Sequence, residues 1–242
     1  MPTSDYSLIS SIVDIVFKAK PQTVLDIGIG FGKYGFLFRE YLDIYGHTSL
    51  DDYKKSGWKT RIDGIEIYEP YVLEHQKFLY SNLYIGDVCE LLPKLDDYDL
   101  IFIGDVLEHL PQKAGETIIK IMKRKAKYVI FAVPLGRSWE QFGAFGNQNE
   151  THRTEYFECD FSFAKLIKIS QEEEGRDIGL FLYTNPSHHE TKEILKRINI
   201  EGKNGISFHG FTPSIPYRIQ RKLKIFTKAI FKGNFGLRQF KP

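Results

Sequence analysis

Cysteine, long apolar runs and an excess of charge of either sign are all scarce in this sequence. Only two of its 242 residues are cysteines, Cys89 and Cys159, too few for a disulfide scaffold and compatible with a reducing compartment. No apolar run approaches the roughly 20 residues of a membrane-spanning helix. Asp5 stands where a signal peptide would carry positive charge. The net charge of +2 indicates no particular partner. We therefore expect a cytoplasmic protein without a membrane span.

The sequence is 42% hydrophobic and 26% charged, a composition typical of one sizeable globular domain with an appendage. The appendage is indicated by charge, because residues 217–242 contain eight basic residues and no acid. These basic residues alternate with bulky apolar ones at near-helical spacing. Such a helix can lie on an anionic membrane surface, bind phosphates, or dock on a partner or on its own chain. We predict a folded domain over residues 1–186 and a helical basic extension over residues 187–242.

The folded part is organised around residues 23–35, TVLDIGIGFGKYG. An apolar run ends in a cluster of glycines, and an amphipathic segment follows, which predicts a strand, a tight turn and a helix. Glycines allow positive φ and let the backbone approach a ligand, and a helix N-terminus offers unpaired N–H groups. Gly30-x-Gly32-x-x-Gly35 also satisfies the dinucleotide-binding pattern. Asp26, however, lies inside the strand end, where a carboxylate repels a pyrophosphate and favours a cationic ligand.

The segment D-x-G-x-G-x-G after an apolar strand resembles the first motif of class I S-adenosylmethionine (SAM) methyltransferases. The resemblance covers roughly residues 20–185 and implies SAM as the cofactor. It implies that Gly28, Gly30 and Gly32 wrap the methionine part of SAM, and that Asp26 helps to position its amino group. It also implies that Asp87, beside Val88, recognises the adenine amino group.

Predicted strands alternate with predicted helices, which specifies an α/β fold with a doubly wound, mostly parallel sheet. Ligands of such sheets bind at the carboxyl ends of the strands. Acids lie at four of these ends, namely at Asp26, Glu66, Asp87 and Asp105. Glu66 is placed to accept hydrogen bonds from ribose hydroxyls. Residues 165–171 and 178–184 are predicted to form the antiparallel closing hairpin of the same family.

A second polar group follows the fourth predicted strand. Asp105 and His109 share one side of this turn if it is helical, and Glu108 lies between them. His152 belongs to a polar segment, residues 136–154, suited to covering a substrate. Carboxylates and imidazoles suit Mg²⁺, Mn²⁺ or Zn²⁺. The pattern resembles ubiquinone-pathway O-methyltransferases and small-RNA 3′-terminal methyltransferases, which implies a metal at Asp105, Glu108, His109 and His152. Two alternatives stay open: His152 acts as a general base beside Asp105 and His109, or the turn only shapes the pocket.

The resemblance implies transfer of the SAM methyl group to a nucleophile, and a hydroxyl oxygen is our preferred one. The GFGKYG loop together with the Gly-Asn…Glu-x-His segment, residues 146–152, resembles methyltransferases near polysaccharide genes. This implies a saccharide or small-molecule acceptor. The alternatives are an RNA ribose hydroxyl, an NAD-dependent oxidoreductase or epimerase, and a SAM-binding subunit without activity. Nucleic acid is the less favoured partner, and the basic tail allows a peripheral membrane or partner contact.

Overall fold

The computed structural model describes residues 4–46, 49–136, 141–171, 177–189, 191 and 193–197. Contacts within the chain divide it into Met1–Ile200 and Glu201–Pro242, so all described residues belong to the first unit. The basic tail, residues 217–242, lies outside the described residues, and its membrane or partner contact stays a prediction. Among the described helices, none is both long and apolar enough to cross a membrane.

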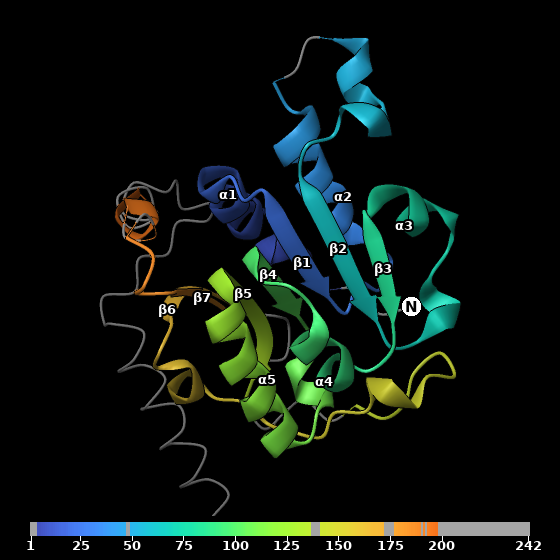
Figure 1. The fold of residues 1–242 in the computed structure, drawn as a ribbon. Coiled ribbons are helices and arrows are strands. Elements are labelled where there is room, and N and C mark those ends of the chain that lie inside the picture. Colours follow the sequence, from blue (N-terminus) through green and yellow to red (C-terminus); the bar gives the residue numbers. More distant parts are fainter. Residues whose placement is uncertain are drawn as a thin grey trace, which may run out of the picture. The chain divides into compact units, whose positions relative to one another are not determined.

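A seven-stranded sheet forms the centre of the first unit (Figure 1). Its strands are β1 (Thr23–Ile27), β2 (Arg61–Glu66), β3 (Asn82–Ile85), β4 (Tyr98–Gly104), β5 (Ala126–Leu135), β6 (Lys165–Gln171) and β7 (Asp177–Thr184). The spatial order is β3-β2-β1-β4-β5-β7-β6. Strands β1 to β5 pair in parallel, and β7 pairs antiparallel with both β5 and β6. The predicted doubly wound sheet and its closing hairpin are thus confirmed.

The helices connect the parallel strands in the predicted alternation. The α-helices are α1 (Ile9–Ala19), α2 (Lys33–Arg39), α3 (Glu74–Leu79), α4 (Val88–Leu91) and α5 (Gln112–Lys125). The short 3₁₀ turns are η1 (Tyr6–Leu8), η3 (Leu50–Tyr53), η4 (Lys55–Gly57), η5 (Glu69–Tyr71), η6 (Leu92–Lys94), η7 (Leu107–His109), η8 (Gln148–Glu150) and η9 (Glu158–Phe161), and α2 continues into the π turn η2 (Glu40–Ile44).

Two hydrophobic clusters cover the two faces of the sheet. Successive side chains of a strand point to opposite faces, so Val24 and Leu100 join the cluster with α1 and α2, whereas Leu25 and Ile101 join the cluster with α4 and α5. Figure 1 shows α4 and α5 in front of the sheet. Ile194 also belongs to the first cluster, so packing continues past the domain boundary predicted at residue 186. The division into a SAM-binding domain and a basic extension stays a prediction.

A buried hydrogen-bond network joins the end of α2 to the start of β2. Arg39 is 1% exposed. Its guanidinium forms an ion pair with Asp43 and donates to the carbonyls of Thr60 (2.8 Å) and Leu79 (3.0 Å). The second oxygen of Asp43 accepts from the backbone amides of Lys59 and Thr60, at 2.8 and 2.9 Å. This buried network fixes the start of β2, and therefore the position of its carboxyl end.

Candidate active site

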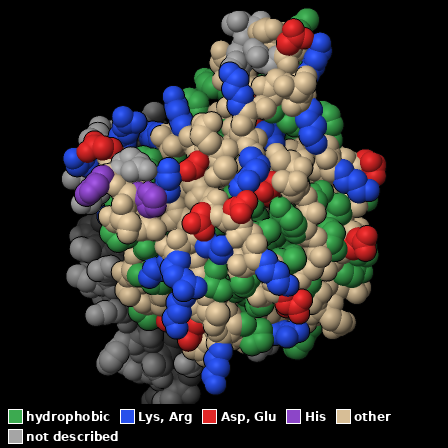
Figure 2. Space-filling view, in the orientation of Figure 1, with side chains coloured by type: hydrophobic (Ala, Val, Ile, Leu, Met, Phe, Trp, Pro, Cys, Tyr) green, Lys and Arg blue, Asp and Glu red, His purple; other side chains and the backbone are tan. Residues whose placement is uncertain are grey.

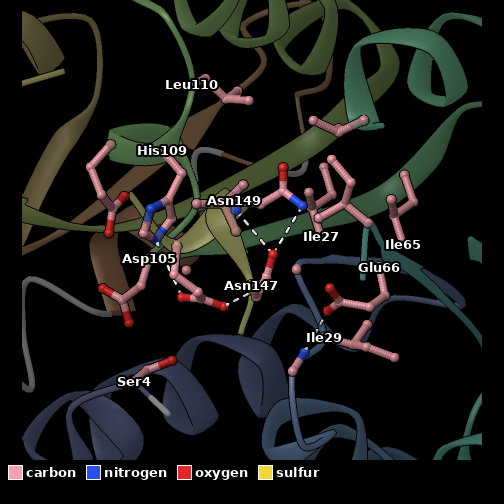
Figure 3. Close-up of a pocket in the computed structure, with 18 of the residues that line it drawn as sticks. Ser4, Ile27, Ile29, Ile65, Glu66, Asp105, His109, Leu110, Asn147 and Asn149 are labelled. Carbon is pink, nitrogen blue, oxygen red and sulfur yellow. Dashed lines mark hydrogen bonds and ion pairs between the residues drawn. The ribbon is translucent and has the colours of Figure 1, made fainter. Parts of the chain in front are cut away.

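A cavity of about 460 Å³ opens at the carboxyl ends of the parallel strands. It is lined by the turn after β1, the end of β2, the turn before α4, and η7 with the segment after β5. In Figure 3, Glu66 and Ile29 lie on one side of the cavity, and Asp105 and His109 lie on the other. The side with Glu66 is called the turn side below, and the side with Asp105 and His109 is called the cluster side.

The glycine turn forms the floor of the turn side. Gly28 and Gly30 line the cavity with φ values of 75° and 49°. A Cβ at Gly28 would stand 2.2 Å from Cγ2 of Val106, so the Val106 side chain occupies the space that a Cβ would need. Gly32, at φ 86°, is the N-cap of α2 and is not one of the described residues that line the cavity. The predicted strand, turn and helix are present.

Asp26 lies behind this turn rather than in the cavity wall. Its side chain is 1% exposed, and it accepts a hydrogen bond from the Tyr80 hydroxyl at 2.5 Å. Burial raises the pKa of this carboxyl to about 7, with the charge of Glu66 adding to the rise and the hydrogen bonds from Tyr80 and Gly35 opposing it. The structure thus places Asp26 as a support of the turn. A contact between Asp26 and a ligand amino group stays a prediction.

Glu66 ends β2 as predicted, and its carboxylate faces the cavity. One oxygen accepts from the Gly30 amide and the other from the Tyr68 amide, both at 3.0 Å. Burial raises the pKa of this carboxyl, and the backbone hydrogen bonds oppose the rise. Each carboxylate oxygen has two lone pairs, so each can accept a further hydrogen bond from a diol in the cavity.

Asp87 and Val88 line the same side, on a turn and not on a strand. Strand β3 ends at Ile85, two residues before the strand end predicted at Asp87, because Asp87 caps α4. One oxygen of Asp87 accepts from the Cys89 amide at 2.8 Å. This cap fixes the carboxyl group at the cavity beside the buried side chain of Val88. The adenine-binding role of the two residues stays a prediction.

The cluster side is built by η7 and the segment after β5, which hydrogen-bond to each other. The carbonyl of Glu108 accepts from the amides of Arg153 (2.7 Å) and Thr154 (3.0 Å), and the Thr154 hydroxyl donates to the Leu110 carbonyl at 2.7 Å. Side-chain nitrogen Nδ1 of His109 lies 3.2 Å from the Thr151 carbonyl. These hydrogen bonds therefore join η7 and the segment around Thr151, 42 residues further along the chain, into one side of the cavity.

Three of the four predicted metal ligands come together on this wall. One ligand atom each of Glu108, His109 and His152 lies within 4.8 Å of the other two. The rings of His109 and His152 are 4.9 Å apart, edge to face. Asp105 lines the cavity but is not a member of this group. Its backbone is left-handed, at φ 52°, a conformation that aspartate tolerates better than most residues.

Burial dominates the electrostatics of this group. It raises the pKa of the Glu108 carboxyl well above its usual range, and the charges of Asp105 and Glu150 add to the rise. Burial also lowers the pKa of His109 to about 4, and the neighbouring His152 and Arg153 contribute to the decrease. His109 is therefore neutral at pH 7 and has a lone pair on one ring nitrogen.

Several cavity residues were not singled out from the sequence. Tyr34 and Tyr71 are both buried. The hydroxyl of Tyr34 has no hydrogen-bond partner in the described part of the chain, whereas that of Tyr71 lies beside Asn147 and Glu150. Lys33 lines the cavity and donates to the carbonyl of Ser4. Glu150 stands in the Glu-x-His pattern with His152, and that spacing is the signal that could have identified it. Nothing in the local sequence distinguishes Tyr34 or Tyr71 from the core aromatics of this chain.

No family model and no curated protein matches the chain. Two solved structures of the N-terminal domain of EvdMO1 are similar in fold. One, determined in the presence of S-adenosylhomocysteine (SAH) and D-fucose, is 12% identical with a TM-score of 0.52, over 75% of this chain and 84% of that chain. The other, with SAH bound, is 11% identical with a TM-score of 0.51, over 73% and 80%. The chain has the Rossmann-like methyltransferase fold.

Proposed function

We propose that this chain is a SAM-dependent methyltransferase that transfers the methyl group to a hydroxyl of a saccharide or another small molecule. The observation that carries the proposal is a single cavity with two chemically different sides. The turn side offers a glycine turn together with the acids Glu66 and Asp87, which suit the amino acid, ribose and adenine parts of SAM. The cluster side offers imidazoles and carboxylates beside the expected position of the methyl group. The EvdMO1 domain of the same fold has SAH bound.

The charge of the cavity supports a cationic cofactor. Among its described lining residues are six acids (Asp5, Glu66, Asp87, Asp105, Glu108 and Glu150) and two cations (Lys33 and Arg153). The excess of acids favours binding of a positively charged sulfonium compound, whereas it repels the pyrophosphate of NAD and the phosphates of RNA. Outside the cavity, Lys and Arg side chains are interspersed with Asp and Glu on the face shown in Figure 2. That face has no continuous basic track for RNA among its described residues.

The chain's own part in the reaction is to position the acceptor oxygen in line with the sulfonium methyl group and to exclude water. The hydroxyl proton must also leave. His152 lies on the cluster side, and its imidazole is a suitable acceptor for the hydroxyl proton. Glu108, His109 and His152 also fit a divalent cation, because their ligand atoms are close together and Oε2 of Glu108 is buried with no hydrogen-bond partner among the described residues. Such a cation, when bound, would lower the pKa of the acceptor hydroxyl.

Transfer of radiolabelled methyl groups tests the proposal. The full-length protein is incubated with methyl-labelled SAM and a panel of neutral monosaccharides and oligosaccharides, including D-fucose, with yeast RNA as a parallel acceptor. We expect label in a saccharide and SAH release in proportion. Label in RNA alone would contradict the saccharide acceptor. Normal SAH affinity without transfer to any acceptor would favour the SAM-binding subunit without activity.

A further inference from the structure

The segment that follows β5 contains a stretch without any charged side chain. Residues 141–149, with the sequence QFGAFGNQN, consist of aromatic, small and amide residues only. The stretch borders the cavity, because Gln141, Asn147 and Asn149 are among the residues that line it. In Figure 3, Asn147 and Asn149 lie between the cluster side and the turn side. A ligand that extends out of the cavity along this stretch therefore meets amides and aromatic rings.

Two phenylalanines of the stretch are exposed to solvent. Phe142 is 79% exposed and Phe145 is 68% exposed. Single exposed apolar residues are common on protein surfaces, whereas neighbouring ones that are rimmed by polar groups mark binding sites. Here the amides of the stretch supply the polar rim. The two rings are thus available for contact with a ligand at the cavity.

The turn that carries Phe145 has an unfavourable backbone conformation. The amide of Asn147 donates to the Ala144 carbonyl at 2.8 Å, which closes a β-turn with Phe145 and Gly146 at its centre. Both central residues have positive φ, 52° and 77°, as in a type I′ turn. Asparagine followed by glycine is a favoured pair at these positions, and a bulky residue with positive φ is an outlier. Since such outliers cluster at functional sites, the ring of Phe145 is expected to serve a ligand.

Hydrogen bonds fix the stretch on the cavity. The backbone amide of His152 donates to the Gln141 carbonyl at 3.0 Å, and the side-chain amide of Gln141 donates to the Glu150 carbonyl at 2.8 Å. Asn147 is 2% exposed, and its Oδ1 accepts from the backbone amide of Asn149 at 3.0 Å. Rings on a backbone that is already ordered lose less conformational entropy when a ligand binds. The two phenylalanine rings are thus presented on a preorganised support.

Neutral sugar rings fit this combination of groups. The C–H bonds on one face of a pyranose ring are electropositive, and the electron-rich face of an aromatic ring attracts them. Amide side chains donate and accept hydrogen bonds, as sugar hydroxyls do. Residues 141–149 contain no cation for a phosphate or a uronate carboxylate. Because RNA binding depends on cations at the phosphates, the stretch favours a neutral saccharide over RNA.

We propose that Phe142 and Phe145 form an outer subsite that stacks on neutral sugar rings of an oligosaccharide acceptor, while the sugar that is methylated occupies the cavity. The inference rests on the proposed function, since it extends the same acceptor beyond the reacting hydroxyl. It makes the length of the saccharide part of the specificity, because only rings beyond the first reach this subsite. Saccharide binding is nevertheless measurable without turnover.

Binding of the full-length protein, saturated with SAH, to an array of neutral monosaccharides and oligosaccharides tests the proposal. Anionic saccharides and RNA are placed on the same array. We expect neutral oligosaccharides to bind about tenfold more tightly than the corresponding monosaccharides, since stacking on an aromatic ring contributes about 1 kcal/mol or more. The oligosaccharide bound most tightly is then titrated calorimetrically into the variants.

Phe145→Asn removes the ring and gives the turn an asparagine-glycine pair. We expect about tenfold weaker saccharide binding together with a higher melting temperature. Phe142→Ala should weaken binding by a similar factor. Phe36→Ala is the matched control, because Phe36 is 55% exposed on α2 and is not among the described residues that line the cavity. Its saccharide affinity should equal that of the wild type.

The proposal would be overturned if no neutral oligosaccharide bound, if RNA or anionic saccharides bound in preference to neutral ones, or if Phe145→Asn kept the wild-type saccharide affinity. A lower melting temperature in Phe145→Asn would also overturn it, because the ring would then serve the fold and not a ligand. SAH affinity is measured on every variant and should be unchanged. Normal SAH binding without saccharide binding would refute this subsite alone, whereas absent SAH binding would refute the proposed function itself.

Discussion

Replacing Glu66 by glutamine is the perturbation whose size follows most directly from the structure. Each carboxylate oxygen of Glu66 accepts a backbone amide at 3.0 Å, one from Gly30 and one from Tyr68. Glutamine keeps one acceptor and turns the other into a donor, which then faces an N–H group. A hydrogen bond to a charged group contributes about 1.5–3 kcal/mol. If the loss falls on the bound state, SAH affinity decreases by about 10- to 150-fold.

Isothermal titration of SAH into wild type and Glu66→Gln measures this change. Glu69→Gln is the control, because Glu69 is an exposed acid three residues further along the same turn. Melting temperatures without ligand separate lost binding from lost stability. Equal SAH affinity in Glu66→Gln and the wild type would contradict a role of Glu66 in ligand binding, because neither the charge nor the geometry of this carboxylate would then matter to the ligand.

Three further predictions concern other parts of the site. Gly28→Ala adds a Cβ 2.2 Å from Val106 at φ 75°, and should destabilise the fold by about 2–4 kcal/mol in urea unfolding. Gly46→Ala, at φ 86° with nothing within 4 Å, should lose only the free energy of placing alanine at a positive φ. Equal losses of stability in the two variants would contradict the clash with Val106. Burial raises the pKa of Asp26 from 3.8 to about 7, so its stabilising contribution is present below pH 4 and is lost as the pH rises through 7. The melting temperature of Asp26→Asn should therefore fall less than that of the wild type between pH 5 and 8, and parallel curves would count against the shift. His152→Ala should lose most turnover while SAH affinity changes less than about twofold, and a wild-type rate would remove His152 from the chemistry.

The sequence was sufficient for features that depend on neighbouring residues. The strand, turn and helix over residues 23–39 follow from an apolar run, glycines and an amphipathic segment, and all three are present. Glu66 and Asp105 were expected near each other because the carboxyl ends of parallel strands meet at one edge. Both line the cavity.

Side-chain directions at the site depended on contacts that are distant in sequence. Because side chains alternate along β1, Asp26 points to the face of the sheet covered by α2. There its carboxylate accepts a hydrogen bond from the hydroxyl of Tyr80, 54 residues away. Nδ1 of His109 lies 3.2 Å from the Thr151 carbonyl, 42 residues away. No local pattern encodes such pairs. For this reason the sequence favoured Asp105 as a fourth ligand, whereas the group of close ligand atoms among the described residues contains only Glu108, His109 and His152.

Titration of SAH into the wild-type protein, with NADH titrated in parallel, shows directly whether the cavity binds SAM. We expect stoichiometric heat with SAH and none with NADH, since the acids around the turn repel a pyrophosphate. Heat with NADH and none with SAH or SAM would contradict SAM binding, and would favour an NAD-dependent oxidoreductase or epimerase.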